Sequence, residues 1–137
     1  MTIEQALAQK LIEDATVDSL VGRYTPGSTE GAIYLEEIPE GESNWPNICI
    51  YPLTPDFGPW REDTIQVSLR AKDTASKMAI EQLRELSDAV INAIILEAWN
   101  IGGFSVRFAD VQTANYIREP GEVSHIPLTV KAVYKKQ

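Results

Sequence analysis

The residues that could act in catalysis are few and lie far apart in the chain. His125 is the only histidine, and Cys49 is the only cysteine. A histidine-dependent triad would have to draw its serine and its acid from elsewhere, and no nucleophile-elbow sequence is present. Cys49 lies within an apolar, strand-like run, where a buried and inert thiol is expected. We therefore interpret both residues as structural.

A cluster of four glutamates is the strongest sign of acid–base or metal chemistry, and it consists of Glu36, Glu37, Glu40 and Glu42. Paired carboxylates serve hydrolysis, but they are frequent in any acidic chain, and this cluster lacks the Asp, Asn and Gly spacing of a calcium loop. A solvated loop is the favoured interpretation. The alternative, a small acidic enzyme with a carboxylate pair in residues 36–42, stays open.

No sequence pattern suited to holding a metal or a cofactor is present. One cysteine cannot form a thiolate zinc site within a single chain, and no phosphate-binding glycine motif or dinucleotide fingerprint occurs. We therefore expect no catalytic residue, no metal and no cofactor.

Three aromatic residues and an arginine form a candidate protein interface instead. Trp45, Phe57 and Trp60 fall in segments rich in turn residues, and Arg61 follows Trp60 directly. Large aromatic side chains and arginine are the residue types that anchor protein interfaces. The alternative is that these aromatic side chains close the ends of the core.

Length and charge limit the remaining possibilities. A chain of 137 residues, 44% hydrophobic and 23% charged, predicts one folded domain spanning residues 1–137. The net charge of −8 disfavours binding to nucleic acid and predicts that copies of the chain repel, so that self-association strengthens with ionic strength. Neither a signal peptide nor a membrane span is apparent, so we expect synthesis and folding in the cytoplasm.

Two helical regions are predicted. Thr2 and Gln5 have the spacing of a capping box, and the helix that follows is expected to break near residues 14–16. The longest periodic segment, residues 75–99, is apolar over about half of its circumference. It should therefore pack on a sheet and also touch the first helix, and the glycines at 102–103 are expected to end it.

Five segments have the alternating polarity or the β-branched content of strands, and they are residues 32–38, 47–53, 63–72, 104–112 and 124–134. The last two are expected to pair in an antiparallel manner across a turn at residues 118–121. Pro127 lacks an amide proton, which favours an edge or the start of a strand.

The order of these segments predicts an α+β domain. We expect an antiparallel sheet of about four to five strands, with mixed pairing allowed at an edge, and two main helices packed on one of its faces.

Four sequence segments, and the order in which they follow one another, resemble the tail terminator, or tail completion, proteins of long-tailed bacteriophages, which include minor tail proteins of lambda-like phages. The segments are SLVGRY at 19–24, WPNICIY at 45–51, VSLRAKDTASKMAIEQLRELSDAV at 67–90 and YIREPGEVSHIPLTVKAVY at 116–134. The resemblance covers nearly the whole chain. The chain departs from the family in its acidic segment, residues 27–43, which is longer than the compact loop expected there.

The resemblance implies a structural virion protein. It implies an α+β subunit that forms a hexameric ring on the head-proximal end of the tail tube, stops tube growth and offers a surface to the head. Its implied partners are other copies of itself, the tail tube protein and a head-completion or connector protein. It implies no catalytic residue and no cofactor. The alternative is a head-to-tail connector protein of the same neck region.

Overall fold

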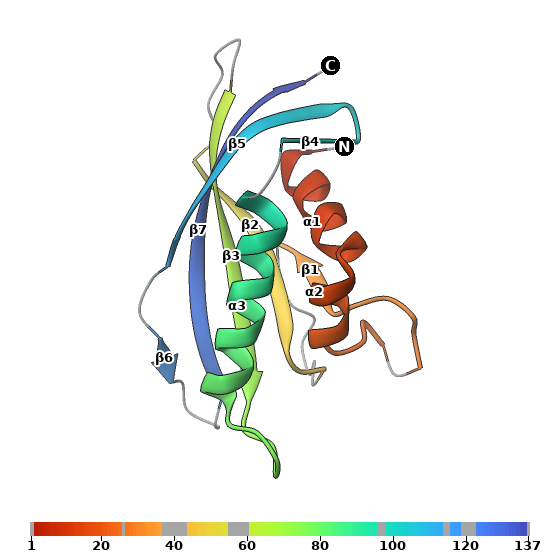
Figure 1. Ribbon diagram of the computed structural model, residues 1–137, viewed down its shortest axis with the longest axis vertical. Coiled ribbons are helices and arrows are strands. Elements are labelled where there is room, and N and C mark those ends of the chain that lie inside the picture. Colours follow the sequence, from red (N-terminus) through yellow and green to blue (C-terminus); the bar gives the residue numbers. More distant parts are fainter. Residues whose placement is uncertain are drawn as a thin grey trace.

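Three helices cover one face of a curled β-sheet (Figure 1). The computed structural model describes residues 2–25, 27–36, 44–54, 61–95, 98–113, 116–118 and 123–136. Its elements in chain order are α1 (Ile3–Glu13), α2 (Ala15–Leu20), β1 (Ile33–Leu35), β2 (Asn47–Thr54), β3 (Arg61–Lys72), α3 (Ala79–Ile95), β4 (Trp99–Ile101), β5 (Phe104–Thr113), β6 (Ile117–Arg118) and β7 (Val123–Lys136). The predicted α+β class is confirmed.

Side-chain caps set the boundaries of α1 and α2. The Thr2 hydroxyl accepts a hydrogen bond from the Gln5 amide at 3.2 Å, and the Gln5 side chain accepts one from the Thr2 amide at 2.8 Å. This is the predicted capping box. The predicted break is also present, because Asp14 ends α1 and its carboxylate accepts the amides of Thr16 and Val17 to start α2.

The third helix begins at Ala79, whose amide donates to the Asp73 carboxylate at 2.8 Å. Its predicted extension to residue 99 was wrong. Trp99 belongs instead to β4, which forms a hairpin with β5 through Gly102 and Gly103. Both glycines have positive φ, 60° and 81°, as a tight two-residue hairpin turn requires. The glycines therefore join two strands rather than end a helix.

The sheet is larger than predicted, with seven strands among the described residues. The strand order is β1-β2-β3-β7-β5-β4, and β6 also pairs with β7. Only β1 and β2 are parallel, so the mixed pairing lies at one edge, while the other pairs are antiparallel. The two strands that the sequence did not reveal are β4, whose residues continue an apolar helical pattern, and β6, which has two residues.

β7 lies in the interior of the sheet, between β3 and β5. The predicted antiparallel pairing of β5 with β7 is confirmed. The prediction that Pro127 occupies an edge or a strand start was wrong. On the side of β7 away from β3, the described pairs with β6 end at His125 and those with β5 start at Leu128. Pro127 therefore lies at a gap between these two sets of described pairs. A residue without an amide proton is tolerated at such a gap.

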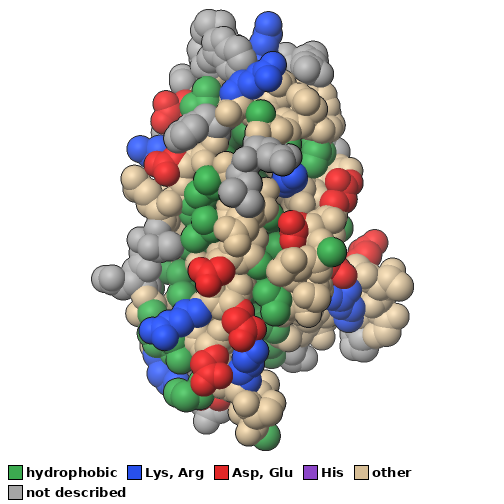
Figure 2. Space-filling view, in the orientation of Figure 1, with side chains coloured by type: hydrophobic (Ala, Val, Ile, Leu, Met, Phe, Trp, Pro, Cys, Tyr) green, Lys and Arg blue, Asp and Glu red, His purple; other side chains and the backbone are tan. Residues whose placement is uncertain are grey.

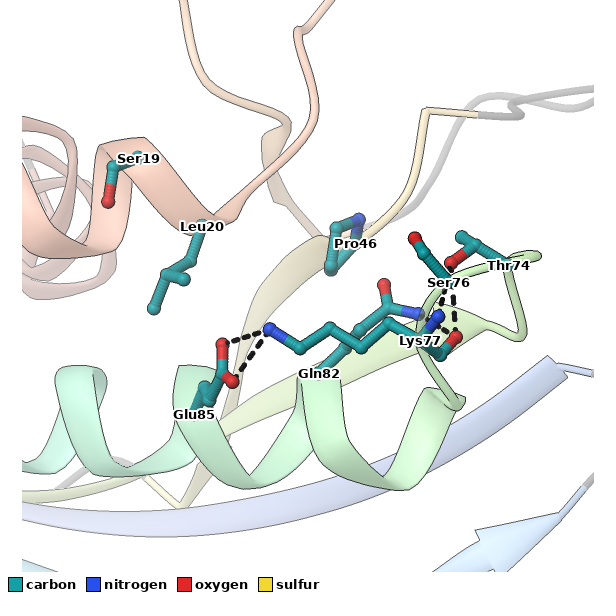
Figure 3. Close-up of a pocket in the computed structure, with 8 residues that line it drawn as sticks. All are labelled: Ser19, Leu20, Pro46, Thr74, Ser76, Lys77, Gln82 and Glu85. Carbon is teal, nitrogen blue, oxygen red and sulfur yellow. Dashed lines mark hydrogen bonds and ion pairs between the residues drawn. The ribbon is translucent and has the colours of Figure 1, made fainter.

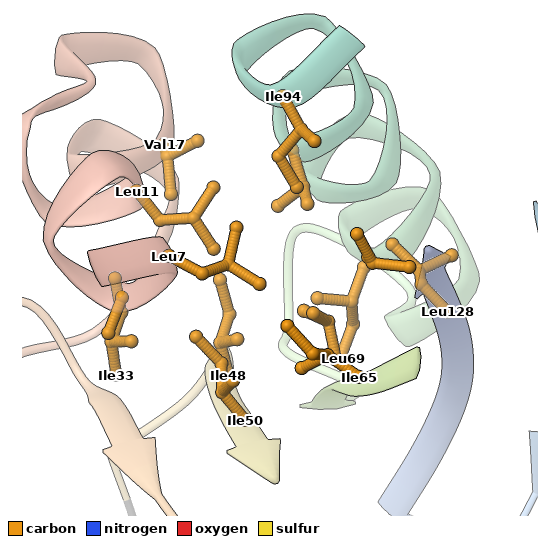
Figure 4. Close-up of a cluster of buried hydrophobic side chains, with 14 of the residues drawn as sticks. Leu7, Leu11, Val17, Ile33, Ile48, Ile50, Ile65, Leu69, Ile94 and Leu128 are labelled. Atoms are coloured by element: carbon orange, nitrogen blue, oxygen red, sulfur yellow. The ribbon is translucent and has the colours of Figure 1, made fainter. Parts of the chain in front are cut away.

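The hydrophobic core lies between the helices and the concave side of the sheet. Figure 4 shows Leu7 and Leu11 of α1, Ile94 of α3 and side chains of four strands meeting there. The long helix packs on β3, β5 and β7 and also contacts α1 and α2, which confirms its predicted neighbours. Because the sheet curls, α1 contacts both β1 and β4, the two end strands. No helix of the described residues has the length and apolar character needed to cross a membrane.

Candidate interaction surfaces

Trp45 lies just before β2, beneath two basic side chains of β3. The Arg70 guanidinium carbon is 5.5 Å from the centroid of the indole ring, and the Lys72 ammonium is 5.3 Å from it. Residues two apart on a strand point to the same side, so β3 presents both cations to one ring. This cation–π arrangement holds a half-buried aromatic side chain beside positive charge, a combination that is common at protein interfaces.

Arg61 lies at the opposite end of β3, opposite Tyr134 of β7. The buried Tyr134 hydroxyl donates a hydrogen bond to the Asp63 carboxylate at 3.0 Å. Burial first, and then Asp63, raise the pKa of Tyr134 to about 12, while a hydrogen bond with Arg61 acts to lower the pKa. Arg61 thus takes part in a polar network at the end of the core.

Trp45 and Arg61, the two predicted interface residues that the structure describes, lie far apart. Trp45 contacts Lys72, the last residue of β3, whereas Arg61 is its first. A strand of twelve residues spans about 35 Å, so the two lie at opposite ends of the sheet. Phe57 and Trp60 are outside the described residues. The partners of Trp45 could not be identified from the sequence, because they depend on how β2 and β3 align.

The residues that were considered for chemistry are dispersed. Cys49 is buried on β2, and His125 lies on β7 opposite Arg70. Glu36 is exposed at the end of β1 with φ of 67°, and the other three glutamates of its cluster are outside the described residues. Within the described ranges, no group of three or more His, Cys, Asp or Glu side chains is placed to hold a metal ion.

One hollow lies between α2 and the start of α3, with a volume of about 210 Å³ (Figure 3). The Lys77 ammonium crosses it and pairs with both carboxylate oxygens of Glu85, at 2.6 and 2.7 Å. The charged groups of this hollow are therefore already paired with each other, which argues against a site for a charged ligand.

A second hollow, of about 420 Å³, lies between α1 and the edge strand β1. Three of the large hydrophobic side chains that are exposed on this protein line it, Ile12, Tyr24 and Leu35. The Tyr24 ring packs against Tyr34 with ring centroids 5.0 Å apart. Exposed apolar groups gathered at one hollow are typical of a contact surface.

We call the face of the sheet that no described helix covers the open sheet face. It is polar where β3, β7 and β5 lie side by side, whereas its β1–β2 part holds a small apolar cluster of Tyr34, Cys49 and Tyr51. Register places side chains of three strands together on this face, because paired residues point to the same side: Thr64 with Lys131 and Asp110, and Gln66 with Thr129 and Gln112. The alternating burial of β3 shows the same division, with Ile65, Val67, Leu69 and Ala71 buried on the other side. The alternation predicted for residues 63–72 already indicated this face.

The comparisons with known proteins show a shared fold. The sequence matches no family profile and no curated protein. The structure is similar to a chain in a solved structure titled "Virion of native gene transfer agent (GTA) particle", with a TM-score of 0.64 and 16% identity. The match covers 96% of this chain and 93% of that chain. The two chains thus share a fold over nearly their full lengths.

Proposed function

We propose that this protein is a structural component of a phage or phage-like virion, and that it forms a ring on the head-proximal end of a tail tube. The observation that supports this most strongly is the fold shared with a chain of a gene transfer agent virion, over 96% of the present chain. The resemblance of four sequence segments to tail terminator proteins agrees with it and supplies the more specific role.

In this role the protein stops tube growth and provides the surface to which the head joins. Its partners are other copies of itself, the tail tube protein and a head-completion or connector protein. It is made in the host cytoplasm and resides in the tail or neck of the virion. The role requires no enzymatic activity, no metal and no cofactor, and it involves no membrane and no sequence-specific contact with nucleic acid.

Tail length tests this proposal directly. Tails assembled without the protein should be overlong or headless in electron micrographs, and adding the purified protein should restore a uniform length. The head-to-tail connector alternative predicts tails of normal length that fail to join heads. A protein that stays monomeric in native mass measurements even when tail tubes are present would overturn the ring. A hydrolytic activity lost in a His125→Ala variant would overturn the expectation that the protein is not an enzyme.

A further inference from the structure

The open sheet face carries positive charge although the chain as a whole is acidic. Strand register places four basic and two acidic described residues on this face, a net of +2: Arg70, Lys72, Lys131 and Lys135 against Glu62 and Asp110. The net charge of the whole chain is −8. The negative charge must therefore be concentrated elsewhere on the molecule.

The helical layer carries much of that negative charge. Counting the three helices and the cap residue between α1 and α2, there are seven acidic and two basic residues, a net of −5: Glu4, Glu13, Asp14, Asp18, Glu81, Glu85 and Asp88 against Lys10 and Arg84. Figure 2 shows acidic side chains along α3 and over α1 on this face. The two broad faces of the subunit thus have opposite net charge.

A closed ring needs two different patches on each subunit, which meet head to tail. We infer that, in the ring proposed above and resting on that proposal, the open sheet face of one copy docks on the helical layer of the next copy. The basic side of the contact is formed by Lys131 and Lys135, which are four residues apart on β7 and therefore about 13 Å apart, close to the length of about 10 Å from Glu81 to Asp88. The acidic side is the stripe of Glu81, Glu85 and Asp88 on α3.

The α3 stripe is the best acidic counterpart because its members are all exposed and spaced four and three residues apart. Side chains at this spacing lie on one side of a helix. Lys77 already pairs with Glu85. The exposed Arg84, three residues after Glu81 and four before Asp88, lies on the same side, so α3 carries a net charge of −2.

The polar character of the open sheet face suits a contact between soluble subunits. Thr64, Gln66 and Thr129 lie half-buried around Lys131 and can hydrogen-bond across an interface. Among the described surfaces, the acidic layer that complements this face belongs to the same chain, so a second copy is the partner that we choose.

This arrangement reverses the salt dependence expected from net charge. Repulsion between copies of charge −8 predicts association that strengthens as salt screens it. Contact between faces of opposite charge predicts association that weakens with salt, because screening removes the attraction. Sedimentation of the wild-type protein across a range of salt concentrations therefore separates the two models.

A matched pair of variants tests the face itself. Lys131→Glu and Lys10→Glu each lower the net charge by two, from −8 to −10, but only Lys131 lies on the open sheet face. Lys131→Glu should weaken each subunit contact about tenfold, whereas Lys10→Glu, which adds negative charge to the helical layer, should leave the contact unchanged or strengthen it. Equal weakening by both variants would overturn the inference. Lys135→Glu, on the same face, replaces Lys131→Glu if the charge next to Asp110 impairs folding.

A mixing experiment gives the sharpest test. The Lys131→Glu, Lys135→Glu variant has an acidic open sheet face, with a net charge of −2 in place of +2, together with its acidic α3. The Glu81→Lys, Asp88→Lys variant has a basic α3, with a net charge of +2 in place of −2, together with its basic open sheet face. Each should fail to form rings alone, and the two mixed should form rings in which they alternate, seen as mixed oligomers by native mass spectrometry. Rings formed by either variant alone, or no rings in the mixture while wild-type rings form, would overturn this docking. Failure of the wild-type protein to form rings on tail tubes would instead overturn the proposed function.

Discussion

The Tyr134→Phe substitution should remove a stabilising interaction that depends on pH. The Tyr134 side chain is 2% exposed, and its ring packs edge-on against Phe104 at a centroid distance of 5.4 Å. Its hydroxyl donates to the Asp63 carboxylate, which is itself buried. Phenylalanine keeps the ring and its packing, so the substitution removes only the hydroxyl and its hydrogen bonds.

The size of the effect follows from the hydrogen bond and from the pKa of Tyr134. A hydrogen bond to a charged group contributes about 1.5–3 kcal/mol to the free energy of unfolding, and the variant should lose this amount at neutral pH. The pKa of Tyr134 rises from 10.0 to about 12 on folding. Because the folded-state pKa is the higher one, the associated stability is complete below pH 10 and is lost as the pH rises towards about 12. Two pKa units correspond to at most about 2.7 kcal/mol, which solvent screening near the end of the sheet reduces to about 1–2 kcal/mol.

Denaturant unfolding of both proteins, from neutral pH upwards, measures this effect. The other tyrosines and the lysines titrate in both proteins, so the difference in the free energy of unfolding between wild type and Tyr134→Phe isolates the one hydroxyl. The difference should be largest below pH 10 and should shrink as the pH approaches about 12. A difference that stays constant over this range would refute the raised pKa, and no difference at neutral pH would refute the hydrogen bond.

Three further predictions concern the core, the start of α3, and the predicted interface residues Trp60 and Arg61. Leu83→Ala should lower the free energy of unfolding by about 2–5 kcal/mol because Leu83 is fully buried, whereas Ile95→Ala, at a residue 46% exposed, should lower it by less than about 1 kcal/mol. Similar denaturation midpoints for the two variants would mean that the Leu83 face of α3 is not in the core. Hydrogen bonds from the Ala79 amide, and then from Arg118, lower the pKa of Asp73, so the stability due to its carboxylate is present above pH 3.8 and is lost as the pH falls through the lowered pKa. Thermal melts of Asp73→Asn should therefore show less acid sensitivity than those of the wild type, and an unchanged acid profile would count against this cap. A Trp60→Ala, Arg61→Ala variant should fold yet give overlong tails by electron microscopy, and normal tails would remove these two residues from the interface.

Local signals in the sequence identified much of the fold. The capping box at Thr2 and the alternation of residues 63–72 depend on neighbouring residues alone, and both were predicted correctly. The end of α3 was not, because Trp99 continues the apolar helical pattern, and only pairing with β5 shows that it lies in a strand. The interior position of Pro127 likewise depends on where β5 and β6 stop pairing, which no local pattern encodes.

The candidate surfaces were predictable in part, for the same reason. Residue types alone marked Trp45 and Arg61 as interface residues, but strand length places them at opposite ends of β3. The opposite charges of the two faces could not be read from net charge, since that sum hides their distribution. They emerge once the register shows which side chains share a side of the sheet.

The interior place of β7 has a consequence for how the chain folds as it is synthesised. β7 is the last strand in chain order, and it joins two half-sheets, β1-β2-β3 and β5-β4. Until residues 123–136 have been synthesised, the two half-sheets are not connected. The edges of β3 and β5, which are twelve and ten residues long, are then not paired with β7. Long bare strand edges are templates for pairing with other chains. Truncation before Val123 should therefore yield an aggregating product, and the open sheet face exists as one surface only after β7 is in place.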